Sequence, residues 1–193
     1  MAQTAANVSY AKPAVGGAAY VAPLGTTLPT DAKTALATTY KALGYISEDG
    51  LRNEPTIDSD TIKAWGGDVV LNINKGKTDL FKFKLIEMLN EDVLKTVYGA
   101  ANVTGSASTM LTVKSNNAEQ EALIWVFDMV LKGGMLKRVI VPNGTITDIG
   151  EIAYIDSDAV GYDLTVSAAV DASGNTHTEF IEKPASGGGG GGT

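Results

Sequence analysis

Short runs of alternating apolar and polar residues, separated by Gly, Asn, Asp and Ser, fill most of this chain after residue 68. This period-two alternation is typical of strands with one buried face, and the small polar residues between the runs are typical of turns. We therefore expect a mainly β fold: a β-sandwich or barrel-like domain of antiparallel strands. The expected strands cover residues 68–74, 79–84, 109–114, 121–132, 136–141, 145–154, 162–170 and 176–182, with turns at 75–77, 133–134 and 142–144.

One run is apolar on both faces. Within residues 121–132, the side chains of Leu123, Trp125, Phe127 and Met129 alternate with those of Ile124, Val126 and Val130. A strand that is apolar on both sides must be covered on both sides. A lone two-layer domain with one solvated face would not require this, so we expect the strand to pack at a contact between subunits.

Residues 85–98 break the alternation, because their apolar side chains recur at spacings of three and four. This spacing predicts one flanking α-helix, with Gly99 placed to end it. Asn90 allows a second interpretation, in which it caps a shorter helix that begins at Glu91.

The ends of the chain differ in composition from the middle. Residues 1–35 hold scattered Ala, Gly, Thr and Pro, and we interpret them as an N-terminal arm that packs on the domain or on a neighbour, with a short helix capped by Thr30 or Asp31. Residues 36–183 form the expected domain. Residues 184–193 are a Gly-rich tail, which fits a native tail, a hinge to a further domain or a cloning remnant.

A long polar segment at about residues 52–67 is expected to be a loop, and it carries unexpected apolar side chains. Ile57, Ile62 and Trp65 lie within it, followed by the Gly66-Gly67 pair, which we interpret as a hinge. Structureless loops of this length inside a domain are uncommon and are often binding elements. We expect this loop to fold against something, such as another subunit.

Charge argues against a nucleic-acid-binding surface. The net charge is −7, and residues 139–182 contain acidic residues but no Lys or Arg. Such a surface would repel a phosphate backbone. The acids of this segment are Asp148, Glu151, Asp156, Asp158, Asp163, Asp171, Glu179 and Glu182.

Catalytic patterns are weak. The chain has no cysteine and one histidine, His177, which we interpret as a surface residue. Asp156 and Asp158 resemble the start of a calcium loop, but Val160 and Ser167 do not fit its later ligand positions, so an acidic turn is the better interpretation. A glycosidase that uses two of the carboxylates of the acidic segment is the remaining catalytic alternative. We expect no enzyme activity, no cofactor and no metal site.

The N-terminus lacks the pattern of a secretory signal, and the chain has no run of 18 apolar residues. We therefore expect a soluble protein with no membrane partner.

Several segments in one order carry a family resemblance. They are Gly44-Tyr-Ile-Ser-Glu-Asp-Gly50, Asp60-Thr-Ile-Lys-Ala-Trp-Gly-Gly-Asp68, Val93-Leu-Lys-Thr-Val-Tyr-Gly99 with Asn102-Val103, Lys137-Arg-Val-Ile-Val-Pro-Asn143, Gly161-Tyr162 and Gly174-Asn-Thr-His177. With these segments the chain resembles the major tail proteins, or tail tube proteins, of long-tailed siphophages that infect Gram-positive and actinobacterial hosts.

The resemblance implies a structural virion protein made in the host cytoplasm. It implies hexameric rings that stack into a tail tube, with DNA passing through the lumen at ejection without specific binding. Tape measure protein and tail terminator are the implied partners. No catalytic residues carry over.

Three residue-level hypotheses combine the resemblance with the sequence pattern. The segment at 52–67 would be an inter-ring stacking loop, residues of the 121–132 strand would line a subunit seam, and two acids would face the lumen. The stacking residues are Arg52, Ile57, Asp58, Asp60, Ile62 and Trp65; the seam residues are Leu123, Trp125, Phe127 and Met129; the lumen acids are Asp163 and Asp171.

Two other classes stay open on the sequence. An Hcp-like secretion tube protein shares the expected architecture. A monomeric immunoglobulin-like or lectin-like binding module would instead need a ligand pocket or an aromatic patch, and the sequence indicates neither.

Overall fold

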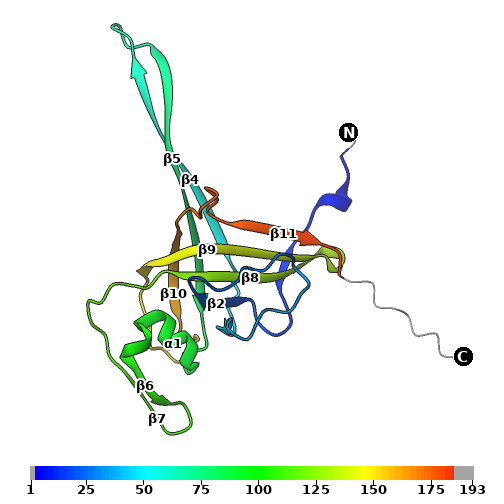
Figure 1. The fold of residues 1–193 in the computed structure, drawn as a ribbon, viewed down its shortest axis with the longest axis vertical. Coiled ribbons are helices and arrows are strands. Elements are labelled where there is room, and N and C mark those ends of the chain that lie inside the picture. Colours follow the sequence, from blue (N-terminus) through cyan, green and yellow to red (C-terminus); the bar gives the residue numbers. More distant parts are fainter. Residues whose placement is uncertain (1–2, 185–193) are drawn as a thin grey trace, which may run out of the picture.

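The computed structural model describes residues 3–184, and the Gly-rich tail from residue 185 lies outside them. The prediction of a mainly β, antiparallel fold with one α-helix is confirmed (Figure 1). The strands are β1 (Ala11–Pro13), β2 (Ala19–Pro23), β3 (Lys41–Ala42), β4 (Arg52–Lys63), β5 (Val69–Leu85), β6 (Val103–Ser106), β7 (Met110–Val113), β8 (Leu123–Leu131), β9 (Leu136–Ile149), β10 (Tyr162–Ala168) and β11 (Thr178–Glu182). The helices are α1 (Glu91–Tyr98) and the short 3₁₀ turns η1 (Ala5–Asn7), η2 (Ala100–Asn102) and η3 (Lys132–Gly134).

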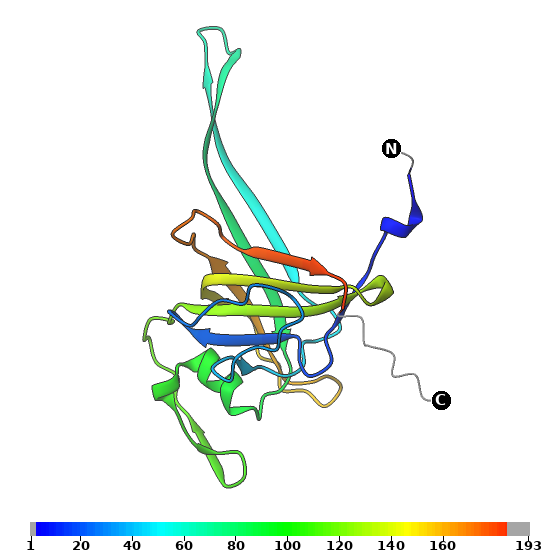
Figure 2. The ribbon, with the colours of Figure 1, turned by 45° about the vertical axis from the view of Figure 1, so that its right-hand side comes forward.

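One curled sheet forms the body. Its strand order is β3-β2-β8-β9-β10-β5-β4, with β1 on β8 and β11 on β9, and β6 and β7 form a separate hairpin. The sheet does not close, because β3 and β4 end the order without pairing to each other. Figure 2 shows β4 and β5 continuing far beyond this body as a projecting pair of strands.

The predicted N-terminal arm over residues 1–35 is wrong for part of its length. β2 is an inner strand that pairs with both β3 and β8, and its Ala19 and Ala22 are buried. Alanine gives little period-two signal, so the alternation of this strand was invisible in the sequence. Asp31 caps a turn by accepting hydrogen bonds from the backbone amides of Lys33 and Thr34, and no helix follows it.

The core lies on both faces of the central strand β8. On one face Trp125 and Phe127 pack with Phe83, whose ring centroid lies 5.6 and 5.1 Å from theirs. On the other face Ile124 and Val126 pack in a second, smaller cluster that includes Tyr40 and Phe180. Both coverings come from this chain, which explains why the strand is apolar on both sides.

Two predicted turns are wrong because the strands run through them. β5 passes through residues 75–77, where Lys75 is an extra residue in the ladder with β4. β9 passes through residues 142–144, where its register with β8 shifts. Pro142 sits at this irregularity, as expected for a residue that cannot donate a ladder hydrogen bond.

The helix begins later than the predicted residue 85. Leu85 still belongs to β5, and the Asn90 side chain accepts a hydrogen bond from the Asp92 amide at 3.0 Å as the N-cap of α1. The shorter helix beginning at Glu91 is therefore confirmed. Val93 and Val97 bury its apolar side against the main core. The predicted strand at 145–154 is also shorter, because β9 ends at Ile149.

Candidate functional site: a projecting arm

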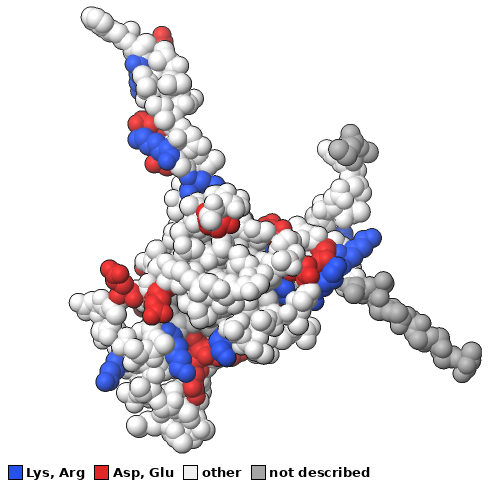
Figure 3. All heavy atoms as spheres, in the orientation of Figure 1, with Lys and Arg blue, Asp and Glu red and all other residues white. Residues whose placement is uncertain are grey.

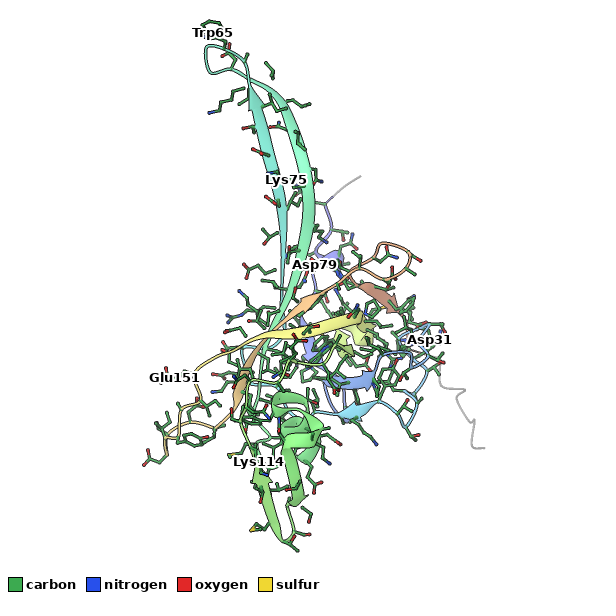
Figure 4. The ribbon with its side chains drawn as sticks, turned by 60° about the vertical axis from the view of Figure 1, so that its left-hand side comes forward. Asp31, Trp65, Lys75, Asp79, Lys114 and Glu151 are labelled. Atoms are coloured by element: carbon green, nitrogen blue, oxygen red, sulfur yellow. The ribbon has the colours of Figure 1, made fainter. Side chains whose placement is uncertain are left out.

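The segment predicted as a loop at 52–67 is wrong as a loop: residues 52–63 form strand β4, which pairs with β5 along its whole length. We call residues 56–78 the arm. Every residue from 52 to 78 is exposed, and burial on β5 begins at Asp79 (Figure 4). At about 3.3 Å per residue, the paired strands of the arm extend about 30 Å.

The arm has two chemically different faces. Cross-strand partners point to the same side of a ladder, so the pairs Ile62 with Leu71 and Asp60 with Ile73 share one face. We call Ile62, Leu71 and Ile73 the apolar stripe; their exposed fractions are 48%, 52% and 40%. The opposite face carries the polar pairs of Thr61 with Asn72 and Ser59 with Asn74.

Alternation of side chains along β4 places the apolar stripe on the same face of the sheet as the outer surface of the body. Asn53 pairs with the core residue Phe81, so the even-numbered positions of β4 point away from the core. The stripe therefore lies on the side opposite the core and meets none of the apolar groups that the core buries. Val69 does not share its face with Leu71, because the extra residue Val70 shifts the register there.

A tight turn closes the arm at its tip. The Ala64 amide donates to the Asp68 carbonyl at 2.8 Å and the Gly67 amide donates to the Ala64 carbonyl at 3.0 Å. Gly66 and Gly67 have φ of 122° and 101°, as predicted for a pair that needs left-handed backbone. Trp65 is fully exposed at this tip (Figure 4).

The structure brings most of the predicted stacking residues onto one element. Ile57, Asp58, Asp60, Ile62 and Trp65 lie on the arm. Arg52 lies at its base and pairs with Asp49 at 3.1 Å. Asp60 pairs with Lys75 at 2.9 Å, midway along the arm, and the proximity of this lysine lowers the pKa of the Asp60 carboxyl.

Two of the four predicted seam residues on β8 are already covered within the single chain. Trp125 is 0% exposed and Phe127 is 1% exposed within the single chain, and β8 is paired on both edges. Leu123 and Met129 are half-buried against the same core. Side chains that their own chain has already covered cannot form a contact with a neighbour without unfolding.

The two predicted lumen acids lie at opposite ends of β10 and are not brought together. Asp163 is exposed on the outer face, opposite Lys84 on β5. Asp171 lies in the turn after β10 and accepts hydrogen bonds from the amides of Ser173 and Asn175, at 2.8 Å each. The Asn175 amide and the other amides of this turn hold the pKa of the Asp171 carboxyl below its ordinary value.

The acid-only segment does not make an acid-only surface. Strands β4 and β5 lie beside it and contribute Arg52, Lys82 and Lys84 to the same outer face. Lys84 forms an ion pair with Asp158 at 3.1 Å, and Asp158 therefore acts as a surface partner here. Both signs of charge are visible along the arm and around the body (Figure 3).

Sequence reasoning missed a polar cluster at the base of the arm. Asp79 is 0% exposed, and one of its carboxylate oxygens accepts hydrogen bonds from Lys77 Nζ at 2.9 Å and from the Thr176 hydroxyl. His177 Nδ1 lies 3.2 Å from the same oxygen, so the interpretation of His177 as a plain surface residue is wrong. Burial by itself raises the pKa of the Asp79 carboxyl, but these polar neighbours outweigh it and keep the pKa below its ordinary value.

Among the described residues, no group of three or more His, Asp or Glu side chains is arranged to hold a metal ion. No helix in residues 3–184 has the length and apolar content needed to cross a bilayer.

The comparisons with known proteins give one family match. The sequence model of a family described as "Phage tail tube protein" matches residues 4–187, which include the whole sheet and the arm. None of the curated proteins compared with the chain matches it. Because the family match spans nearly all of the sequence, the chain belongs to the phage tail tube proteins, which are structural components of the virion.

Proposed function

We propose that the protein polymerises as stacked hexameric rings that form the tube through which the phage genome is ejected. Family membership supports the tube. Rings of six are what the resemblance implies. The exposed arm is the feature that supports the stacking of rings along the tube axis. In this account the tape measure protein and the tail terminator contact the finished tube, DNA passes through it without specific binding, and no catalysis is involved.

The arm is built for a contact that the single chain does not make. A two-stranded ribbon alone is marginally stable in water, and the arm extends about ten residues past the body. Its apolar stripe and Trp65 are exposed, although contiguous exposed apolar groups favour association. We expect this surface to contact a copy of the same chain in the adjacent ring, since stacking joins two different surfaces of identical subunits.

Trp65 is the residue to change first. Large aromatic side chains contribute strongly when an interface buries them, and Trp65 is fully exposed in the single chain. We expect Trp65→Ala to abolish or shorten tubes seen by negative-stain electron microscopy, while the thermal unfolding midpoint stays unchanged. Normal tubes from this variant would contradict the role of the arm tip.

A control separates the arm from exposed aromatics in general. Tyr154 is 73% exposed in the segment between β9 and β10, away from the arm. We expect Tyr154→Ala to form tubes like the parent. If the parent protein itself stays monomeric at high concentration, the tube proposal fails before the arm is tested.

A further inference from the structure

The cluster around Asp79 lies where the arm leaves the body (Figure 4). Asp79 pairs with Pro55 across the β4–β5 ladder and is the first buried residue of β5 below the arm. Two residues further along β5, the ring of Phe81 stacks on Phe127 in the core. Asp79 thus stands at the boundary between a fully exposed ribbon and a fixed sheet.

The partners of Asp79 come from two places. Lys77 belongs to the arm itself, whereas Thr176 and His177 belong to the connection between β10 and β11. The ring of His177 also meets the edge of Phe81, with centroids 5.4 Å apart. One carboxylate therefore ties the arm to a segment almost 100 positions away in the sequence.

That connection is itself held firmly. Asp171 closes a turn over residues 171–175, with its amide donating to the Asn175 carbonyl at 2.9 Å. The Ala169 amide donates to the Asn143 carbonyl of β9 at 2.8 Å. The turn is thus fixed to the sheet on one side and delivers Thr176 to Asp79 on the other.

The cost of burying Asp79 points to a role beyond packing. Its second oxygen, Oδ1, is buried and has no hydrogen-bond partner among the described residues. An unsatisfied buried carboxylate oxygen destabilises a fold, and an apolar residue of similar size at such a position is often as stable or more stable. A charged group here instead fixes the orientation of the arm relative to the connection between β10 and β11, because its hydrogen bonds are directional.

We propose that Asp79 is a positioning residue that clamps the base of the arm to Thr176 and His177, directly after the turn at 171–175, and so sets the direction in which the arm leaves the body. The clamp also connects the turn that carries Asp171, a proposed lumen acid, to the proposed inter-ring contact. The direction of the arm is a property of the single chain, whereas its consequence for assembly rests on the proposed function.

The direction of the arm can be measured in the monomer. The chain has no cysteine, so Thr61→Cys on the arm and Asp148→Cys on β9 give two unique sites for spin labels. We expect the two spin labels, placed in the otherwise unchanged protein, to give one narrow distance distribution by pulsed electron paramagnetic resonance. Asp79→Leu and Thr176→Val should each broaden it and shift its maximum, because the clamp is lost.

Glu54→Gln is the matched control. It breaks the exposed Glu54–Lys82 ion pair of 2.5 Å at the same level of the ladder, but on the outer face. We expect the distance distribution of this variant to equal that of the parent. If Asp79→Leu does not fold, Thr176→Val carries the test alone, since it keeps the shape of the side chain and replaces the hydroxyl with a methyl group.

The outcomes are distinguishable from those of the proposed function. Unchanged distributions in both clamp variants would overturn the positioning role, whether or not tubes form. A broadened distribution together with normal tubes would support the clamp and contradict the role of the arm in stacking. A broadened distribution with tube formation lost supports both.

Discussion

A single residue, Arg138, attaches the irregular segment after β2 to the sheet. Arg138 is 4% exposed and forms a two-point ion pair with Asp128, at 2.7 and 2.8 Å. Its remaining nitrogen donates to the carbonyls of Asp31 and Thr34, so one guanidinium fastens the irregular segment after β2 to the sheet. Arginine suits this place because its planar fork presents several donors at once.

Arg138→Met should therefore destabilise the protein strongly. The change leaves the half-buried Asp128 carboxylate unpaired, and removing one partner of such a pair costs about 3 kcal/mol or more. Urea unfolding followed by circular dichroism measures the difference. The control, Lys95→Met, breaks the exposed pair with Glu91 on α1 and should cost less than about 0.5 kcal/mol. Equal losses for the two variants would contradict this account.

Sequence reasoning had little access to such residues. Arg138 and Asp128 lie ten positions apart on neighbouring strands, and their pairing depends on the register between β8 and β9. The same holds for Asp79 and His177, which are brought together only by the fold. Gly144 is another example: a Cβ there would lie 2.7 Å from the Trp125 ring, a close approach that a Pro-Asn-Gly sequence does not reveal.

At the scale of elements, the pattern predicted the core strands well and the arm poorly. β8 and β10 bury alternate or successive side chains, and their alternation in the sequence reports that burial. β4 is exposed along its whole length, so no apolar alternation marks it, and its pairing with β5 was not recognised. The residues of the candidate site were found because exposed Ile and Trp are unusual in polar surroundings, not because the element was known.

The apolar stripe gives the element-scale prediction. Leu71→Thr combined with Ile73→Thr keeps good strand-forming residues on β5 but removes apolar groups from the stripe. If the stripe is buried between copies, this variant should give folded protein that no longer elongates into tubes, as seen by electron microscopy.

The opposite face of the same strand supplies the control. Asn72→Ser combined with Asn74→Ser alters two polar positions of β5 that alternate with those of the stripe, and tubes should form normally. Should both double variants assemble equally well, the stripe is not the contact surface.

At the scale of the whole molecule, the chain combines a body that buries its own core with an arm whose apolar side chains do not pack against that body. The body buries both faces of β8 from within, so this strand needs no neighbouring subunit to be covered. The arm, by contrast, carries exposed apolar groups on a ribbon about 30 Å long. The fold class was predictable because turn residues and alternation are local, whereas the strand order, the inner position of β2 and the projection of the arm depend on contacts distant in sequence.

The central claim is that the arm joins successive rings, and a cryo-electron microscopy reconstruction of assembled tubes tests it most directly. The account predicts Trp65 and the apolar stripe buried against a subunit of the next ring, with Asp163 and Asp171 facing the lumen. Arms that project freely into solvent, with rings joined only through their bodies, would contradict it.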